Sequence, residues 1–440
     1  MLHVAPKGRK HLSADALFRL VYRGFDHLPD YRPPDADITL TDALMSAFAR
    51  FSLKAPSLLA FDKERTAGNL PTIYGIERVP CDPHMRALLA PVSPASLRPV
   101  FQSVVTQLQR GHALTPMAFF DDHYLLALDG TGYFASKTMH CASCLRKVHR
   151  NGAITYSHQL LGAAILHPDV RAVIPLRPES MVHQDGPAKN AWERHAAKRF
   201  IVTLRQDYPH LQFIVTEDSL SANAPHIETL RTPGLRYLLG VTEGDHAYLF
   251  RQVQAAAQAG RVTSYERYDR AAGRVHRFRL INDVPLNASN TAVRVNCIAS
   301  WEVGDEKEQH CSWVTDLPVH RRTVYRLMRG GRARWKIENE TFNTLKNQGY
   351  RVAHNYGHGQ QHLSVGLATV MMLAFLVDQT QQRCGALLQA VWAKLGSKRL
   401  RWERLRAWFY TSALASMRQL LEALFYGVQK PAPIFAGDST

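Results

Sequence analysis

Hydrophobic positions in the first part of the chain recur at intervals of three and four residues. Residues 40–53 (LTDALMSAFARFSL) and 94–111 (PASLRPVFQSVVTQLQRG) both have this spacing. It is typical of amphipathic helices, which bury one apolar face. We therefore expect a helical N-terminal region over residues 1–120.

The pattern then changes to short apolar runs that end in acidic or turn-forming residues. Residues 124–131, 158–168 and 211–218 are runs of this kind, and buried strands have such a pattern. Helical periodicity returns between the last two runs, over residues 187–209. This order predicts an α/β core with its functional site at one edge of a sheet, and we assign residues 121–232 to it.

From residue 233 to 318 the helical period disappears, and β-type segments alternate with Gly, Asn and Asp. This predicts an antiparallel β-rich insertion over residues 233–318. Residues 319–385 are predicted to be the second part of the α/β core, and residues 386–440 a basic helical C-terminal tail. The longest apolar run, Val365 to Val377, is thirteen residues long. It is too short to span a bilayer, which takes about 20 residues, so it predicts a buried helix.

Charge is the part of the composition that narrows the function. The sequence has 54 Lys plus Arg against 37 Asp plus Glu, a net charge of +17 with His neutral. A nucleic-acid backbone is the commonest partner of such a surplus, and an anionic membrane surface is the alternative. The N-terminus lacks the apolar stretch of a secretory signal, and six cysteines in 440 residues are too few for a disulfide scaffold. Both observations favour a cytoplasmic protein.

Three acidic residues are candidates for a shared metal site. Asp129 follows one apolar run, Asp218 follows another, and Glu338 lies in a basic helical segment. Mg²⁺ prefers oxygen ligands, so two Asp and one Glu that converge suit a two-metal phosphodiester site. Each Asp has another interpretation: Asp129 precedes Gly and can form a turn, and Asp218 can cap the next helix.

Helix geometry favours Glu338 over its neighbour Glu340 as the third acid. Arg334, Glu338 and Phe342 recur at four-residue intervals, and we predict that their face is half-buried. Glu340 lies about 200° round the helix from Glu338. It follows Lys336 by four residues, which is typical of a solvent-exposed ion pair.

Three blocks of the sequence resemble DDE transposases of bacterial insertion sequences. They are LALDGTGYF, TEDSLSANAP and RWKIENETFNTLKNQGY, and the resemblance spans roughly residues 75–380. The acids are separated by 218 − 129 = 89 and 338 − 218 = 120 residues. The long second gap is similar to that of the branch with a β-rich insertion in an RNase H-like fold, and the predicted insertion falls in it.

The resemblance implies the chemistry of the site. It implies that Asp129, Asp218 and Glu338 bind Mg²⁺, for which Mn²⁺ can substitute. With these ions they would cleave DNA at the ends of an insertion sequence and join the ends to target DNA. The partners it implies are double-stranded DNA, as terminal inverted repeats and as target, and a second copy of the chain on DNA, with no membrane. The location it implies is the bacterial cytoplasm, at the nucleoid. Given this resemblance, our hypothesis for the helical N-terminal region, residues 1–120, is end-specific DNA binding.

The sequence departs from the family's pattern at two positions. Gly331 stands where the family has Tyr, and Leu345 stands where it has Lys, which here is Lys346. Glu340 therefore remains open as the third acid, because it precedes Lys346 by six residues and Glu338 precedes it by eight.

Basic residues around the third acid are predicted to contact DNA phosphates, with Arg as a bidentate donor and Lys as a point charge. These residues are Arg322, Arg326, Arg332, Arg334, Lys336 and Lys346. Glu179, Glu193 and Lys198 are candidate supports of the site, or else surface charges. Two other functions stay open: a catalytically inactive or domesticated DNA-binding descendant, and a metal-dependent nuclease without strand transfer.

Cysteine and histidine residues cluster in the sequence HCASCLRKVH: His140, Cys141, Cys144 and His149. Their spacing is compatible with a zinc site that includes Cys141 and Cys144, but a second close pair is lacking, and the alternative is a loop after a strand. A further group recurs at four-residue intervals: His354, His358 and His362. Glycines interrupt this helical spacing, so we interpret these histidines as DNA-facing or packing residues.

Overall fold

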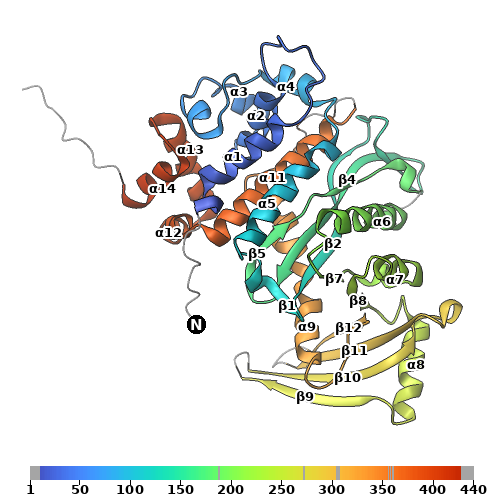
Figure 1. Cartoon of the computed structure of the whole chain (residues 1–440). Coiled ribbons are helices and arrows are strands. Elements are labelled where there is room, and N and C mark those ends of the chain that lie inside the picture. Colours follow the sequence, from blue (N-terminus) through green and yellow to red (C-terminus); the bar gives the residue numbers. More distant parts are fainter. Residues whose placement is uncertain are drawn as a thin grey trace, which may run out of the picture. The chain divides into compact units, whose positions relative to one another are not determined.

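The structure is a computed structural model that describes residues 10–186, 189–270, 273–303, 308–354, 356, 358 and 361–427. The chain divides into two compact units (Figure 1). The first comprises Met1–Ala113, Gln348–Tyr350 and Leu373–Thr440, and the second comprises Leu114–Asn347 and Arg351–Met372. Residues 1–9 and 428–440, which belong to the predicted N-terminal and C-terminal regions, lie outside the described residues.

The first unit is helical and is built from both ends of the chain (Figure 1, blue and red). Its helices are α1 (Ala14–Asp26), α2 (Leu40–Ser52), α3 (Leu58–Asp62), α4 (Asp82–Leu89), α5 (Arg98–Arg110), the end of α11 (Leu363–Cys384), α12 (Ala386–Leu395), α13 (Lys398–Thr411) and α14 (Met417–Tyr426). The predicted helices over residues 40–53 and 94–111 are present as α2 and as α5 with the 3-10 turn η3 (Pro94–Leu97). The N-terminal region and the C-terminal tail, predicted as separate regions, therefore belong to one unit.

A buried ion pair lies inside the first unit. Lys54, directly after the C-cap of α2, contacts the Asp378 carboxylate of α11 through Nζ, and the two side chains are 0% and 6% exposed. The Tyr350 hydroxyl donates to the same carboxylate. Asn69 also donates to the Phe409 and Ser412 carbonyls, so side chains from the first seventy residues hold the C-terminal helices.

The second unit contains a mixed sheet of twelve strands in the order β3-β4-β2-β7-β8-β12-β11-β10-β9, with β1 on β2 and with β5 and β6 on β4. The strands are β1 (Ala118–Phe120), β2 (His123–Ser136), β3 (Leu145–Val148), β4 (Ile154–His167), β5 (Val170–Pro175), β6 (Glu179–Met181), β7 (Phe213–Thr216), β8 (Arg236–Val241), β9 (Thr263–Asp269), β10 (Arg274–Pro285), β11 (Arg294–Val303) and β12 (Glu308–Thr315). The strands β2, β7 and β8 are parallel, and the other pairs are antiparallel. The structure is thus of the mixed α/β class, with helices at both ends of the chain.

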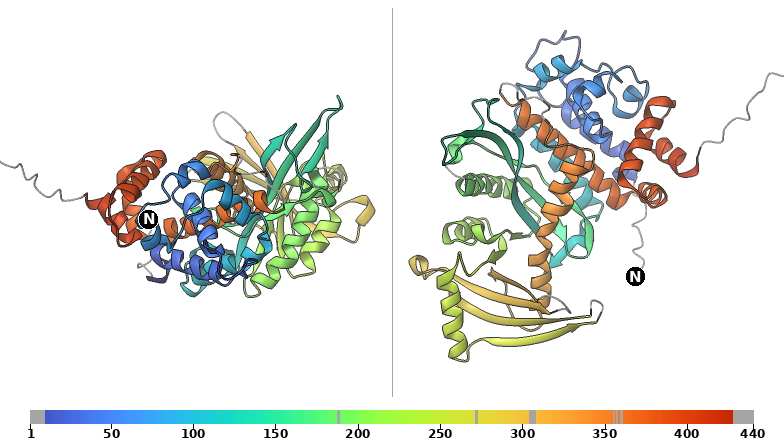
Figure 2. Two further views of the ribbon diagram at one scale, coloured as in Figure 1. Left: turned by 90° about the horizontal axis from the view of Figure 1, so that it is seen from above. Right: turned by 180° about the vertical axis from the view of Figure 1, so that it is seen from behind.

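Helices cover both faces of the central part of this sheet (Figures 1 and 2). On one face lie α6 (Lys189–Asp207), which contacts β2 and β4, and α7 (Ala224–Arg231), which contacts β8. On the other lie α9 (Val324–Ala333) and the π-helical turn η8 (Ile337–Phe342), which α10 (Asn343–Asn347) continues. Because η8 contacts β2, β4 and β5, the turn that carries Glu338 lies against the strand that carries Asp129.

Two features of the second unit differ from the sequence prediction. The range predicted to lack helical periodicity contains α8 (Ala247–Gln258). This prediction is wrong: residues 247–258 (AYLFRQVQAAAQ) are rich in helix-forming residues, and they form a helix that buries Leu249 and Ala256. In addition, β8 pairs in parallel with β7, so the first strand of the predicted insertion continues the central sheet.

The apolar run that we predicted to be a buried helix lies within α11. This helix has 22 residues, and by length and composition alone it could cross a membrane. Of its most apolar 18-residue window, 83% is buried inside the protein. Its apolar side chains are therefore accounted for by packing, which agrees with the prediction of a buried helix.

Candidate active site

Asp129 lies in the middle of a strand rather than at its end. The strand β2 has 14 residues and continues to Ser136, and Asp129 pairs with Gly162 of β4. The alternative interpretation of Asp129 as a turn former is therefore wrong. Its side chain is 22% exposed, and its Oδ1 accepts the Gly130 N–H at 2.8 Å.

Asp218 follows β7, the strand next to β2, and lies close to Asp129. Both line a small pocket of about 20 Å³, together with Glu193 of α6. The capping interpretation also holds, because Asp218 Oδ1 accepts the Leu220 N–H at 3.1 Å at the start of the 3-10 turn η6 (Ser219–Ser221). The parallel pairing of Ala127 with Thr216 thus places the two predicted carboxylates at the same level, just beyond the end of β7.

Glu338 is joined to Asp129 through Arg334. The Arg334 Nη1 donates to Glu338 Oε1 at 3.0 Å and to Asp129 Oδ2 at 3.4 Å. The Glu338 side chain is 52% exposed, while that of Arg334 is only 15% exposed. The predicted half-buried face therefore holds for Arg334, whereas Glu338 extends toward solvent from the π-helical turn.

The environment of Asp129 favours its protonated form when no cation is close. The pKa of Asp129 is raised to about 7, mainly by burial and to a lesser extent by the nearby charges of Glu338 and Asp218. The Arg334 guanidinium and the Gly130 N–H oppose this rise. Such a carboxyl group gains the most from a bound cation, because the cation replaces the hydration that burial removes.

Glu340 points to a different part of the unit. It pairs with Arg171 of β5 at 3.3 Å. The predicted partner Lys336 is instead engaged elsewhere, since its Nζ donates to the carbonyl oxygens of His167, Pro168 and Val170. Of the two glutamates, Glu338 is the one that the structure connects to Asp129.

A glycine on β4 allows the third acidic segment to lie close to the sheet. A Cβ atom at Gly162 would lie 2.6 Å from the Phe342 ring, which packs there from the end of η8. Because Gly162 pairs with Asp129, this contact fixes the height of η8 above the strand that carries the first acid. The position of Glu338 thus depends on a glycine, which has no side chain, at position 162.

A buried pair beside Asp218 was not predicted. The His226 Nε2 donates to Glu217 Oε2 at 2.5 Å, and both side chains are 5% exposed. Burial lowers the pKa of His226, but the Glu217 carboxylate outweighs burial and raises it overall. Both residues line the pocket of the two Asp residues, and the acidic pair in the sequence TED was the available sequence signal.

The three predicted supporting residues have different surroundings. Glu193 lines the pocket with Asp129 and Asp218. Glu179 pairs with Arg177 and Arg199, each at 3.0 Å, and Lys198 is exposed on α6. Only Glu193 is thus placed beside the acids.

Some of the predicted DNA-contacting residues are exposed, and some contact other side chains of the protein. Arg322 and Lys346 are exposed. Arg326 lies over the rings of Phe119 and Phe120, at 5.4 and 5.2 Å, and Arg332 pairs with Glu302 of β11. The phosphate contacts stay predictions, and for Lys336 such a contact would require its bonds to the carbonyl oxygens to break.

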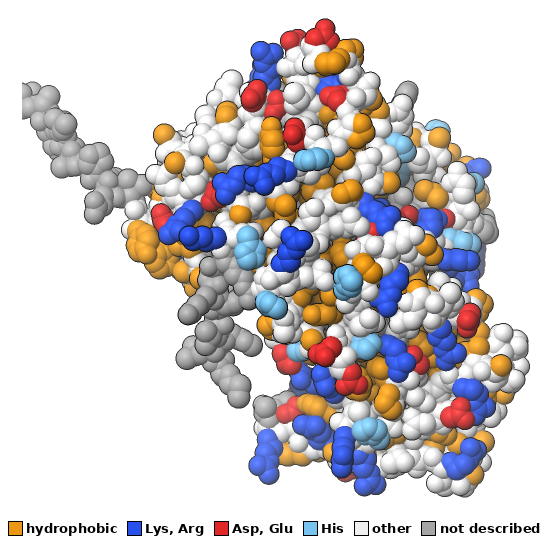
Figure 3. All heavy atoms as spheres, viewed as in Figure 1, with side chains coloured by type: hydrophobic (Ala, Val, Ile, Leu, Met, Phe, Trp, Pro, Cys, Tyr) orange, Lys and Arg blue, Asp and Glu red, His pale blue; other side chains and the backbone are white. Residues whose placement is uncertain are grey.

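Basic side chains also occur away from the acids. Figure 3 shows Lys and Arg side chains at the lower edge of the molecule, where β9 and β10 lie in Figure 1. These strands carry the basic residues Arg267, Arg274, Arg277 and Arg279. The β-rich part therefore adds positive charge to the second unit.

The cysteines of the predicted zinc site lie close to two histidines that are distant from them in the sequence. Cys141 and Cys144 lie close to His158 of β4 and to His358. His149, which we considered as a ligand, instead contacts the Thr155 hydroxyl at 2.8 Å.

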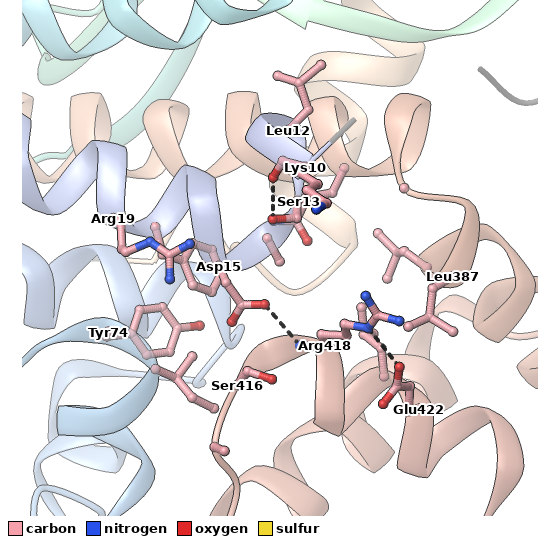
Figure 4. Close-up of a pocket in the computed structure, with 18 of the residues that line it drawn as sticks. Lys10, Leu12, Ser13, Asp15, Arg19, Tyr74, Leu387, Ser416, Arg418 and Glu422 are labelled. Atoms are coloured by element: carbon pink, nitrogen blue, oxygen red, sulfur yellow. Dashed lines mark hydrogen bonds and ion pairs between the residues drawn. The ribbon is translucent and has the colours of Figure 1, made fainter. Parts of the chain in front are cut away.

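A much larger cavity, of about 890 Å³, lies in the first unit (Figure 4). Lys10, Asp15, Arg19, Arg418 and Glu422 are charged residues of its lining. The Asp15 carboxylate accepts the N–H groups of Met417 and Arg418, and Arg418 pairs with Glu422. A converging set of acids such as that around Asp129 is not among its described lining residues. We therefore place the candidate active site at the smaller pocket.

Chemically, the site combines oxygen ligands with a cationic side chain. Three carboxylates from a strand, a strand end and a helix provide the hard ligands that Mg²⁺ and Mn²⁺ prefer. Comparison with known proteins adds no family, since no family model and no curated protein matches the chain. The functional argument therefore depends on the site itself.

Proposed function

We propose that the protein is a DNA transposase of the DDE type, which cleaves DNA at the ends of an insertion sequence and joins them to a target. One observation supports this most directly. Asp129 and Glu338 share Arg334, and Asp218 lines the same pocket as Asp129. Residues 209 positions apart in the sequence (338 − 129) thus lie close together, which supports the roles that the resemblance implies.

The architecture supports an RNase H-like core. The central strands β5, β4 and β2 are antiparallel, and β7 and β8 follow in parallel to β2, with helices on both faces. The strands β9 to β12 separate this core from α9 and η8 in the sequence. This is the arrangement expected if a β-rich insertion lies between the second and third acids.

The proposed chemistry assigns roles to the residues of the site. Asp129, Asp218 and Glu338 would hold Mg²⁺ or Mn²⁺, ions that lower the pKa of an attacking water or hydroxyl and stabilise the leaving oxygen. Arg334 offsets the repulsion between Asp129 and Glu338, and its remaining donors suit a phosphate oxygen. Glu217 and His226 hold the loop that follows β7 and so position Asp218.

The test is cleavage and joining of a labelled duplex that carries the element's ends, with Mg²⁺ or Mn²⁺. We expect Asp129→Ala, Asp218→Ala and Glu338→Ala each to abolish both steps. Glu340→Ala is the matched control, because Glu340 lies two residues from Glu338 and pairs with Arg171. We expect it to retain activity.

Other results would change the assignment. An inactive Glu340→Ala with an active Glu338→Ala would move the third acid to Glu340. Binding of the ends by the native protein without cleavage would indicate a DNA-binding descendant. Cleavage without joining would indicate a nuclease.

A further inference from the structure

Four metal-binding side chains meet in the second unit, away from the acids. The Cys141 Sγ lies 3.9 Å from Cys144 Sγ and 3.4 Å from His158 Nε2. The Cys144 Sγ lies 3.6 Å from His158 Nε2 and 3.4 Å from His358 Nε2. All four ligand atoms lie within 4.8 Å of one another.

These separations match a tetrahedral metal site. A zinc ion at about 2.3 Å from sulfur and about 2.0–2.1 Å from nitrogen would place its ligand atoms roughly 3.4–3.8 Å apart. Four of the six separations, at 3.4 to 3.9 Å, fall close to this range, and all six are within 4.8 Å. Two thiolates and two imidazoles are also a ligand set that favours zinc over harder ions.

The local backbone supports a metal-binding turn. The Cys144 N–H donates to the Cys141 carbonyl oxygen at 3.1 Å, which closes the C-x-x-C segment into a turn. The Cys141 N–H lies 3.4 Å from Cys144 Sγ, so a backbone donor faces the sulfur. Such a donor would stabilise the negative charge of a thiolate.

The surroundings of the cluster are apolar and aromatic. Cys144 and His158 are 4% and 3% exposed, and the rings of Tyr133 and Phe134 pack against the histidines. Such surroundings limit the access of water to a bound ion and restrict the orientation of its ligands.

We propose that Cys141, Cys144, His158 and His358 bind one structural zinc ion. Four protein ligands complete a tetrahedral shell and leave no open position, which is typical of structural rather than catalytic zinc. The ion would join the connection between β2 and β3, strand β4, and the segment after α10. That segment follows Glu338 in the sequence, so the zinc would anchor the chain shortly after the third acid.

The experiment is metal analysis of the full-length protein after purification without added metal. We expect one zinc per chain. Replacement by Co²⁺ should give the visible absorption of tetrahedral cobalt with two thiolate ligands. X-ray absorption at the zinc edge of the native protein should report two sulfur and two nitrogen neighbours, a result that does not depend on the folding of any variant.

Matched variants separate this site from other zinc binding. Cys144→Ser and His358→Gln should lose most of the bound metal and the cobalt spectrum. His149→Gln and Cys297→Ser should keep both, because His149 contacts Thr155 and Cys297 is buried in β11. None of these measurements uses DNA, so their outcome is independent of the proposed transposase activity.

Three results would overturn the proposal. The first is native protein that contains no zinc and takes up no tetrahedral cobalt. The second is an equal loss of metal in the two control variants. The third is a Cys141–Cys144 disulfide in protein purified under reducing conditions, which would assign the turn to redox chemistry instead.

Discussion

Arg334 is the residue on which the candidate active site depends in the absence of bound cations. It contacts two carboxylates from distant parts of the chain, and one of them, Asp129, is largely buried. Removing it would leave Asp129 next to Glu338 without a compensating charge. A buried charge that loses its oppositely charged partner is costly, so one carboxylate would take up a proton or the two would move apart.

We predict that Arg334→Ala lowers metal-dependent DNA cleavage by about tenfold to a hundredfold, since a hydrogen bond to a charged group contributes about 1.5–3 kcal/mol. The activity of Arg334→Lys should lie between that of the native protein and that of Arg334→Ala, because Lys keeps the positive charge but cannot make two parallel hydrogen bonds. Arg294→Ala, which removes the exposed pair with Asp283 and has no assigned role at the site, is the control. Equal losses in Arg294→Ala and Arg334→Ala would contradict the role given to Arg334.

A second residue-scale prediction concerns the stability of the helical unit. Lys54→Met leaves the Asp378 carboxylate buried with Tyr350 as its partner. We expect a loss of about 3–5 kcal/mol in the free energy of unfolding. The double variant Lys54→Met/Asp378→Leu should recover most of it in chemical denaturation. No recovery in the double variant would mean that packing, rather than charge, explains the loss.

At this scale the sequence predicts some partners and not others. Asp129 and Asp218 were predictable because each follows an apolar run, and buried neighbouring strands bring such positions together. His158 and His358 were not, because they lie 17 residues from Cys141 and 214 residues from Cys144 in the sequence. Their approach depends on the pairing of strands and on the course of the chain after α10.

Among the elements, the π-helical turn η8 decides where the third acid lies. A π-helical turn holds more residues than an α-helical one, so it shifts side chains relative to a four-residue face. This explains why Glu338 is more exposed than we predicted from its position on a half-buried helix face. Phe342, on the same predicted face, is buried against Gly162. Periodicity predicted the helix but could not predict the local change of its pitch.

We predict that Gly162→Ala displaces η8, because its Cβ would approach the Phe342 ring to 2.6 Å. Overpacking of this kind costs about 1–3 kcal/mol. DNA cleavage should fall by more than about tenfold, since small displacements of catalytic groups are costly. The control is Gly132→Ala on the same sheet, where the nearest atom is 3.9 Å away.

Two outcomes would decide whether the contact between Gly162 and Phe342 positions η8. Full activity in Gly162→Ala, with native thermal stability, would contradict the role of the contact. Restoration of activity by a smaller residue at position 342, in Gly162→Ala/Phe342→Leu, would support it.

For the whole molecule, charge is the property that most limits the choice of partner. The surplus of +17 is a property of the sequence, and exposed basic residues occur around α9 and on the β-rich part. The apolar helix α11, which could suggest a membrane, is mostly buried. We therefore expect a polyanion as the partner, and the burial of α11 accounts for its apolar side chains without a bilayer.

We predict that binding to duplex DNA of arbitrary sequence weakens steeply as salt increases. Each neutralised phosphate should contribute about −0.9 to the slope of log K against log salt. Vesicles with anionic lipids should bind far less under the same conditions. Fluorescence anisotropy and co-sedimentation would measure the two. Tight binding to vesicles with weak binding to DNA would favour the membrane alternative.

The helical unit has a consequence for synthesis on the ribosome. Its first five helices leave the ribosome early, but Asp15 accepts the N–H groups of Met417 and Arg418, and Asn69 contacts Phe409 and Ser412. These partners are translated more than three hundred residues later. The apolar faces of the early helices must wait while the sheet forms, so a truncated translation product would contain a foldable sheet and an unfinished helical unit.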